Sequence, residues 1–186
     1  MSEHMSVTHF KMMAVALGFR DLFIPPSKKI RETGMKEGNT VLDFGCGPGN
    51  ITIAAARTVG PTGRVFALDK HPRALESVGK KARKKHLDNI KTFSSDGRIN
   101  LPESSLDFVL LFDVFHDLSS PQPVLKEIYR VLKPEGKLAV NDHHLNKIHI
   151  KKRVEESGPF IFESQGRIST LFQKSGSKLS SAYSQY

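Results

Sequence analysis

The stretch VLDFGCGPGN, residues 41–50, decides how the rest of the chain is interpreted. Its first four residues are mostly strand formers, and the residues from Ile51 onward favour a helix. Between them lie three alternating glycines, Gly45, Gly47 and Gly49. Glycine adopts positive φ at little cost and lets a ligand come close to main-chain N–H groups. Together with the N-terminus of the following helix, this loop predicts a site for a nucleotide-like ligand at the carboxyl end of a parallel strand.

The composition limits the classes of protein to consider. A chain of 186 residues is long enough for one domain with a core that needs no disulfides. Cys46 is the only cysteine, which argues against a disulfide framework and favours a cytoplasmic location. No apolar stretch approaches the length of a membrane span. The net charge of +9 suits an acidic or nucleic-acid partner, or only a solubilising surface.

Strand and helix patterns alternate along the chain from residue 40. Strands are expected at Thr40–Phe44, Val65–Leu68, Ile90–Phe93, Leu106–Phe112 and Lys137–Asn141. Helices are expected after the first, second and fourth strands, and the helix after the fourth strand spans Pro121–Leu132. A helix at Asn146–Ser157 and a hairpin of strands at Phe160–Glu163 and Arg167–Phe172 follow. The alternation predicts an α/β fold with helices on both faces of the sheet, and the hairpin adds one antiparallel strand.

The first 37 residues form a separate part of the pattern. His9 to Phe23 has helical spacing and ends before Pro25, and Ser27 is expected to cap a short second helix. Neither a repeat nor a Pro- or Gly-rich linker marks a boundary, so residues 1–186 are interpreted as one domain. Within it, residues 1–37 would cap the cleft, 38–174 would form the core, and 175–186 would be a mobile tail.

Three carboxylates follow the first three strands: Asp43, Asp69 and Asp96. A carboxylate such as Asp69 can accept from both hydroxyls of a ribose, and Asp96 with Gly97 is placed to meet an adenine ring. An NAD site also needs a glycine loop and an acid about 20 residues further on. The glycines here read G-x-G-x-G, with Asp43 two residues before them, and this differs from the G-x-G-x-x-G of NAD loops.

At this point the chain resembles the class I S-adenosylmethionine-dependent methyltransferases, and within them the quinone-biosynthesis group. The resemblance lies in five ordered blocks: VLDFGCGPGN (41–50), VFALDK (65–70), SSDG (94–97), LPESSLDFVLLFDVFHDL (101–118) and VLKEIYRVLKPEGKLAV (124–140). It covers about residues 38 to 141. It implies a Rossmann-like seven-stranded sheet of order 3-2-1-4-5-7-6 with strand seven antiparallel.

The resemblance also implies roles for particular residues. The loop would hold the methionine part of S-adenosylmethionine, Asp43 would orient the loop or the amino group, and Asp69 would bind the ribose. The full expected set of cofactor contacts is Asp43, Gly45, Cys46, Gly47, Gly49, Asn50, Asp69, Lys70, Asp96, Gly97 and Phe112. Each has a plainer alternative: the glycines can be turn residues, Asp69 a helix cap, and Cys46 a small space-filler.

Methyl transfer requires a general base only if the acceptor must lose a proton. The candidates at the ends of strands four and five are His116, Asp113, Asp142, His143 and His144. Of these, Asp113, His116 and His143 are the predicted catalytic residues. From an extended segment, His143 and His144 cannot both face one cleft. No metal is expected, although Asp113 with Asn141 and Asp142 resembles the metal site of catechol-type O-methyltransferases.

The acceptor is the least determined part of the prediction. A small or lipid-like molecule is favoured, with the cleft closed by the N-terminal helices, by a second subunit or by the acceptor. RNA is the alternative suggested by two basic clusters, at residues 80–85 and 147–153. However, Phe112 to Phe115 lacks the Asn/Asp-Pro-Pro-aromatic signature of enzymes that methylate exocyclic amines. A protein acceptor, or a cofactor-binding module that acts only with a partner, also stays open.

Overall fold

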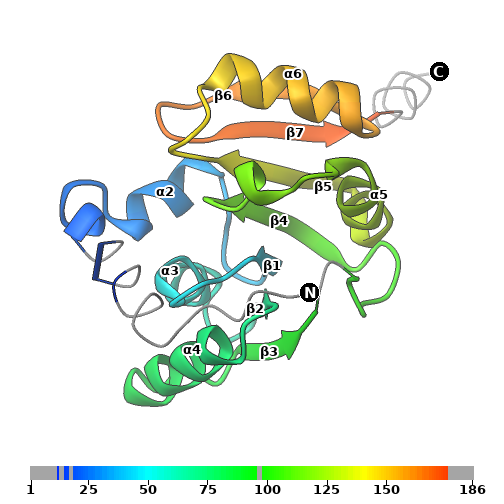
Figure 1. Ribbon diagram of the computed structural model, residues 1–186. Coiled ribbons are helices and arrows are strands. Elements are labelled where there is room, and N and C mark those ends of the chain that lie inside the picture. Colours follow the sequence, from blue (N-terminus) through cyan, green and yellow to red (C-terminus); the bar gives the residue numbers. More distant parts are fainter. Residues whose placement is uncertain (1–11, 13–14, 17–18, 96–97, 176–186) are drawn as a thin grey trace.

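The fold is a single seven-stranded sheet with helices packed against both faces (Figure 1). The computed structural model describes residues 12, 15–16, 19–95 and 98–175. The strand order is β3-β2-β1-β4-β5-β7-β6, and β7 pairs antiparallel with both β5 and β6 while the other pairs are parallel. This confirms the fold class and the strand order expected from the sequence.

The elements follow one another in the alternation that the sequence predicts. The first half contains α2 (Pro26–Glu32), β1 (Thr40–Phe44), α3 (Asn50–Val59), β2 (Arg64–Asp69), α4 (Pro72–Lys84) and β3 (Ile90–Ser94). The second half contains β4 (Leu106–Phe112), the 3-10 turn η1 (Phe115–Asp117), α5 (Pro121–Val131), β5 (Leu132–Asn141), α6 (Lys147–Ser157), β6 (Phe160–Gln165) and β7 (Thr170–Lys174).

The strand β4 lies in the middle of the sheet and explains the two-layered core. Its side chains alternate between the faces, as the pleat of a strand requires. Val109 and Leu111 pack with α5 and α6, whereas Leu110 and Phe112 pack with α2 and α3. Because both faces are covered, the run from Leu106 to Phe112 is almost entirely apolar.

Two local predictions were wrong. The sequence Pro134-Glu135-Gly136 was expected as a turn before the fifth strand, but β5 already begins at Leu132. Leu132 pairs with Leu106, and the next pair along the ladder joins Phe108 to Lys137, so the turn residues bulge out of a strand that continues on both sides. Likewise β7 begins at Thr170, three residues later than expected, because the turn after β6 is longer.

The predicted cap of the second helix was also wrong. The helix α2 begins at Pro26 with Pro25 in the capping position, and no side chain caps it. Proline at the first helical position has its φ already fixed and lacks the N–H that would need a partner, so Ser27 lies inside the helix.

Before α2, residues 12, 15–16 and 19–23 are helical, as expected. Four apolar residues whose spacing predicted this helix, Phe10, Met13, Ala14 and Leu17, lie outside the described residues, and so does the predicted tail from residue 176 onward. None of the described helices is both long enough and apolar enough to cross a membrane.

Candidate functional site

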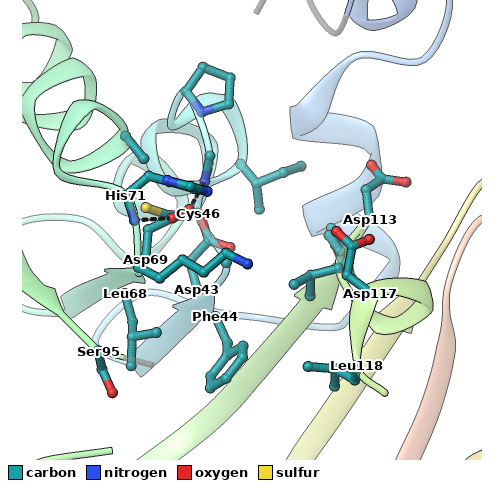
Figure 2. Close-up of a pocket in the computed structure, with 18 of the residues that line it drawn as sticks. Asp43, Phe44, Cys46, Leu68, Asp69, His71, Ser95, Asp113, Asp117 and Leu118 are labelled. Atoms are coloured by element: carbon teal, nitrogen blue, oxygen red, sulfur yellow. Dashed lines mark hydrogen bonds between the residues drawn. The ribbon is translucent and has the colours of Figure 1, made fainter. Parts of the chain in front are cut away.

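A cavity of about 450 Å³ opens where β1, β2 and β4 end (Figure 2). This volume is in the range of small-molecule sites. In the view of Figure 2, Asp43, Asp69 and His71 lie on one side, and Asp113 and Asp117 lie on the other. Of the residues predicted from the sequence, the cavity is lined by Asp43, Gly45, Cys46, Gly47, Asn50, Asp69, Lys70, Phe112 and Asp113.

The main-chain N–H groups of the glycine loop point into the protein. Gly45 and Cys46 both donate to the carbonyl oxygen of Leu68, at 2.8 and 3.0 Å. Gly47 donates to Oδ2 of Asp69 at 2.9 Å. The sequence led us to expect that this loop would offer its N–H groups to a ligand, and for these three residues that expectation was wrong. The loop is instead fixed onto β2 by its own hydrogen bonds.

The three glycines all have positive φ, but they have different surroundings. A Cβ on Gly45 would lie 2.6 Å from Cγ2 of Val114, and a Cβ on Gly49 would lie 2.6 Å from Cγ2 of Val78. Gly49 is absent from the cavity lining, so its role is the close packing of α3 on α4. A Cβ on Gly47 would meet no atom within 4 Å, which leaves space for a ligand at that position.

Asp69 connects the glycine loop to the start of α4. Its Oδ2 accepts from Gly47, and its Oδ1 accepts from the backbone N–H of His71 at 2.8 Å (Figure 2). The residue at the capping position of α4 is His71, so Asp69 is not the helix cap. Each carboxylate oxygen accepts one bond here and has a second lone pair available to a ligand hydroxyl.

Asp43 lies at the base of the cavity and is almost fully buried. Its Oδ2 accepts from the hydroxyl of Thr52 at 2.6 Å, which ties β1 to α3. Burial raises the pKa of Asp43 to about 7, and the neighbouring Asp69 acts in the same direction, while the Thr52 hydrogen bond opposes them. A positively charged ligand group beside Asp43 would favour the carboxylate.

Cys46 is buried, and burial raises the pKa of its thiol above the ordinary value. A thiol kept protonated in this way is a poor nucleophile. The side chain therefore fills space beneath the loop, in line with the plainer interpretation of its sequence position.

The N-terminal helical segment (residues 12, 15–16 and 19–23) closes one side of the cavity through Arg20 and Asp21. Arg20 donates to Oδ2 of Asp113 at 2.5 Å, and Asp21 accepts from the amide nitrogen of Asn50 at 2.6 Å. Lys81 of α4 donates to the same Asn50 side chain. The sequence suggested that residues 1–37 cap the cleft, but contacts across 93 positions, such as Arg20 with Asp113, were not predictable from it.

Asp113 lies close to two cations and a histidine. In addition to Arg20, the buried Lys29 places its Nζ 3.9 Å from Oδ2, and His143 Nδ1 lies 2.8 Å from Oδ1. Burial would raise the pKa of Asp113, but hydrogen bonds from Arg20 and His143 and the charge of Lys29 together lower it. Burial and the charge of Arg20 lower the pKa of Lys29. Asp113 is thus a stable anion and a weak proton acceptor.

A second polar cluster lies next to Asp113 and its partners. Asp142 accepts from Nδ1 of His116 at 2.9 Å and from the backbone N–H groups of His116 and His144. Because the carboxylate only accepts, Nδ1 carries the proton and Nε2 is the basic nitrogen of His116. Neither His116 nor His143 lines the cavity, although their neighbours Asp117 and Asp113 do.

The expectation for the histidine pair rested on an extended segment, and that premise was wrong because residues 143–145 form a bend. Neither His143 nor His144 lines the cavity. The rings of His143 and His144 have centroids 3.9 Å apart, and those of His116 and His144 are 4.2 Å apart. All three rings therefore form one cluster. Ligand atoms of Asp113, Asp142 and His143 lie within 4.8 Å of one another, a spacing a metal could use, but Arg20 and Lys29 already place positive charge on Asp113.

Two predicted contacts, Asp96 and Gly97, lie outside the described residues. Residues that the sequence did not single out also line the cavity. They are apolar or small; four lie between β4 and α5 and the last lies within α5: Val114, Leu118, Ser119, Ser120 and Val124. Their position just after Phe112 and Asp113 was the only indication available.

An open sheet of this strand order, with a reversed seventh strand and a glycine loop between acid-bearing strands, defines the class I methyltransferase fold. A sequence profile described as "Methyltransferase domain" matches residues 35–176. The chain belongs to this methyltransferase domain family.

Curated relatives and solved structures agree with that assignment. A demethylmenaquinone methyltransferase of Lactobacillus johnsonii is 36% identical over 61% of this chain and 47% of its own length. One from Geobacillus sp. is 30% identical over 70% of this chain and 56% of its own length. The chain thus spans about half the length of these relatives. A SAM dependent methyltransferase from Aquifex aeolicus, 29% identical, superposes with a TM-score of 0.71 over 80% of this chain and 86% of that one.

Proposed function

We propose that this chain is an S-adenosylmethionine-dependent methyltransferase that acts on a small, largely apolar acceptor. The observation that carries the proposal is one cavity, lined by the glycine loop and by Asp43 and Asp69, in a chain of the methyltransferase domain family. The space above Gly47, where a Cβ would meet no atom, suits the methionine part of the cofactor. Bound there, S-adenosylmethionine would supply an activated methyl group on its sulfonium.

The residues lining the cavity divide the cofactor between them. The carboxylate of Asp43 pairs with the amino group, and both oxygens of Asp69 have lone pairs left for the ribose hydroxyls. The side chains of Asn50 and Lys70 complete the wall on that side, and Ser95 lies next to the predicted adenine contacts Asp96 and Gly97. Gly49 acts only through helix packing.

The acceptor would lie against the opposite wall. Phe112, Val114, Leu118 and Val124 give that wall an apolar character, which suits an aromatic or lipid-like ring. Alignment of donor and acceptor is the main task of the protein, and alignment can lower a barrier by roughly 7–11 kcal/mol. Relatives named as demethylmenaquinone and 2-phytyl-1,4-naphtoquinone methyltransferases make a quinol-like ring the first acceptor class to screen.

Loss of a proton from such a ring requires a base, and we assign that role to Nε2 of His116, which lies behind the cavity lining and would take the proton through Asp117. Asp142 fixes the tautomer of His116 and holds its ring in place, as the aspartate of a catalytic triad does for its histidine. Nε2 lies 3.4 Å from Oδ1 of Asp117, which lines the cavity. Asp113 binds the N-terminal segment, and His143 helps to hold Asp113 in its ionised form.

An RNA acceptor is less well supported, because many cations of α6 have structural partners. Lys147 donates to the carbonyls of Gly166 and Arg167, and Arg153 donates to those of Phe115 and Leu118. Lys151 lies over the ring of Phe162. These groups are therefore poorly placed to bind phosphates.

Titration calorimetry of the purified chain with S-adenosylmethionine, S-adenosylhomocysteine and NAD tests the proposal. Binding of the first two, with no heat from NAD, is the expected result. Binding would then be followed by a methylation assay with short-chain naphthoquinols, and with RNA as the comparison. A folded sample that binds neither adenosyl compound would contradict the proposal, and binding only after addition of a cell extract would favour a module that acts with a partner.

A further inference from the structure

The N-terminal helical segment presents apolar side chains to solvent. Within the described residues, the exposed large apolar side chains are Met12, Val15, Phe19, Leu22, Phe23, Ile24 and Ile148. The first five are spaced mostly three or four residues apart, so they form a row along one side of the helix. Phe19, Leu22 and Phe23 are 67%, 73% and 80% exposed. A group of exposed large apolar side chains on one side of a helix marks a surface that contacts something apolar.

The orientation of this row is set by the polar residues of the same segment. Arg20 and Asp21 are held at the cavity by Asp113 and Asn50. Phe19, Leu22 and Phe23 are consequently directed outward, and they cannot turn inward without breaking both contacts. The row is a fixed feature of the surface beside the mouth of the cavity.

Exposed basic side chains lie on α2, the helix that follows the row, and on the turn that contacts α2. Lys28 and Arg31 of α2 are exposed, and so is Arg167 in the turn between β6 and β7. Glu32, at the end of α2, accepts from the backbone N–H of Ile168, which places that turn against α2. The start of α6 also lies beside this turn, because Lys147 donates to the carbonyl of Arg167. Ile148, 79% exposed, adds a further apolar side chain at this end of the sheet.

We propose that this face, defined by Phe19, Leu22, Phe23, Lys28 and Arg31, binds the surface of a lipid bilayer that contains anionic lipids. An apolar row flanked by cations is the pattern of segments that lie in the interface of a membrane. The net charge of +9 favours an anionic surface over a neutral one. The segment lies on the membrane and does not cross it. This inference goes beyond the proposed function, because bilayer binding is independent of methyl transfer.

The consequence for the cavity is that its mouth would face the lipid. Arg20 and Asp21 line the cavity from the same helix whose other side carries Phe19 and Phe23. An apolar acceptor dissolved in the bilayer could then reach the wall formed by Val114 and Leu118 without crossing water.

Co-sedimentation of the full chain with vesicles tests the proposal. Vesicles of phosphatidylcholine alone are compared with vesicles that also contain phosphatidylglycerol, at low and high salt. We expect binding to the anionic vesicles that weakens with salt. The triple variant Phe19→Ser/Leu22→Ser/Phe23→Ser should bind at least tenfold more weakly, and Phe19→Leu/Phe23→Leu, which keeps the apolar surface, should bind nearly as the parent does.

A charge-matched pair separates this face from general attraction. Lys28→Ser/Arg31→Ser should weaken binding to anionic vesicles about tenfold. Lys91→Ser/Lys126→Ser removes the same charge from exposed positions on β3 and α5, and should have much less effect. Equal losses in both pairs would overturn the assignment of the face.

Two other results would also overturn the proposal. One is the absence of binding to anionic vesicles at low salt by a folded sample. The other is a dimer in light scattering that the triple serine variant dissociates, because a second copy would then cover the row. Circular dichroism and binding of S-adenosylhomocysteine are measured on every variant. If the parent chain itself does not bind S-adenosylhomocysteine, that result contradicts the proposed function, whereas the vesicle experiment still tests the bilayer proposal.

Discussion

Asp69, the last residue of β2, accepts a hydrogen bond from the backbone N–H of Gly47, with 2.9 Å between Oδ2 and the nitrogen. One carboxylate thereby holds the loop that follows the neighbouring strand and also, through His71, the start of the next helix. The residue expected to bind the ribose is thus also a part of the loop's own framework.

Replacement of Asp69 by alanine should weaken binding of S-adenosylhomocysteine about 10- to 100-fold, since a hydrogen bond to a charged group contributes roughly 1.5–3 kcal/mol. Calorimetry measures the affinity, and thermal unfolding measures how much stability is lost with the loop contacts of Asp69. Asp88→Ala, an exposed acid before β3, is the matched control. Unchanged affinity in Asp69→Ala would show that the carboxylate supports only the loop.

The glycines allow a comparison of two alanine substitutions. Gly45→Ala requires positive φ and drives a methyl group against Val114, so we expect a loss of roughly 2–5 kcal/mol in the free energy of unfolding. Gly47→Ala has positive φ but open space, so a loss of about 1 kcal/mol is expected, with a larger effect on cofactor affinity. Urea denaturation with and without ligand measures both. Equal destabilisation by the two variants would contradict the packing argument.

Asp43 should make stability depend on pH. The raised pKa, about 7 against 3.8 for the ordinary carboxyl, means that the folded state keeps a proton which the unfolded state has released between these values. Stability therefore falls as pH rises from about 4 to 7, by at most about 4 kcal/mol for a shift of about three units. Asp43→Asn has no carboxyl to titrate at this position, so its free energy of unfolding should rise relative to that of the parent between about pH 4 and 7. Urea unfolding at several pH values measures this difference.

The same residue gives a test with the ligand. If the ammonium group of the cofactor pairs with Asp43, binding at pH 6 must release a proton from the carboxyl. Calorimetry in buffers of different ionisation enthalpy measures that release, which should disappear in Asp43→Asn. A proton count that is the same for both proteins would place the amino group elsewhere.

Arg20 and Lys29 should be coupled through Asp113. Lys29→Met alone should change stability little, because Arg20 still neutralises the carboxylate and a buried ammonium is removed. In the Arg20→Gln background the same change leaves Asp113 buried without a full cation, and the loss should be clearly larger. A double-mutant cycle by urea denaturation measures the coupling, with Arg57→Gln on α3 as a control. Strict additivity would mean that the three charges act independently.

His116 should determine the pH profile once an acceptor is known. Loss of a general base typically costs 10²- to 10⁴-fold in rate. We expect His116→Asn to lower kcat to this extent and to remove the acidic limb of the profile, with cofactor affinity unchanged. His149→Asn, on the exposed side of α6, is the control. An activity that keeps its acidic limb in His116→Asn would assign the base to another group.

The sequence was sufficient for the features that depend on local pattern. The apolar run Leu106–Phe112 requires a strand covered on both faces, and its neighbours follow from the alternation of strands and helices. The sequence was insufficient where a side chain chooses between partners far apart in the chain. The reach of Arg20 to Asp113 and the direction of the N–H groups of Gly45 and Gly47 belong to this class.

The bend at residues 143–145 shows the same limit from another side. An extended segment was assumed after β5, and from it the separation of His143 and His144 was inferred. Asp142 instead accepts from the N–H of His144 two residues on, and this turns the chain so that both rings lie together. Asp142 itself was the local indication of that turn, but the sequence does not show whether an aspartate there forms a turn or part of a site.

The internal hydrogen bonds of the glycine loop have a consequence for the energetics of ligand capture. Because Leu68 and Asp69 already hold the N–H groups of Gly45, Cys46 and Gly47, the loop has its final shape before anything enters the cavity. Conformational entropy for these residues is lost when the chain folds, at roughly 1–2 kcal/mol per residue, and is not lost again on binding. The site is preorganised, so an entering molecule selects a shape that folding has already built.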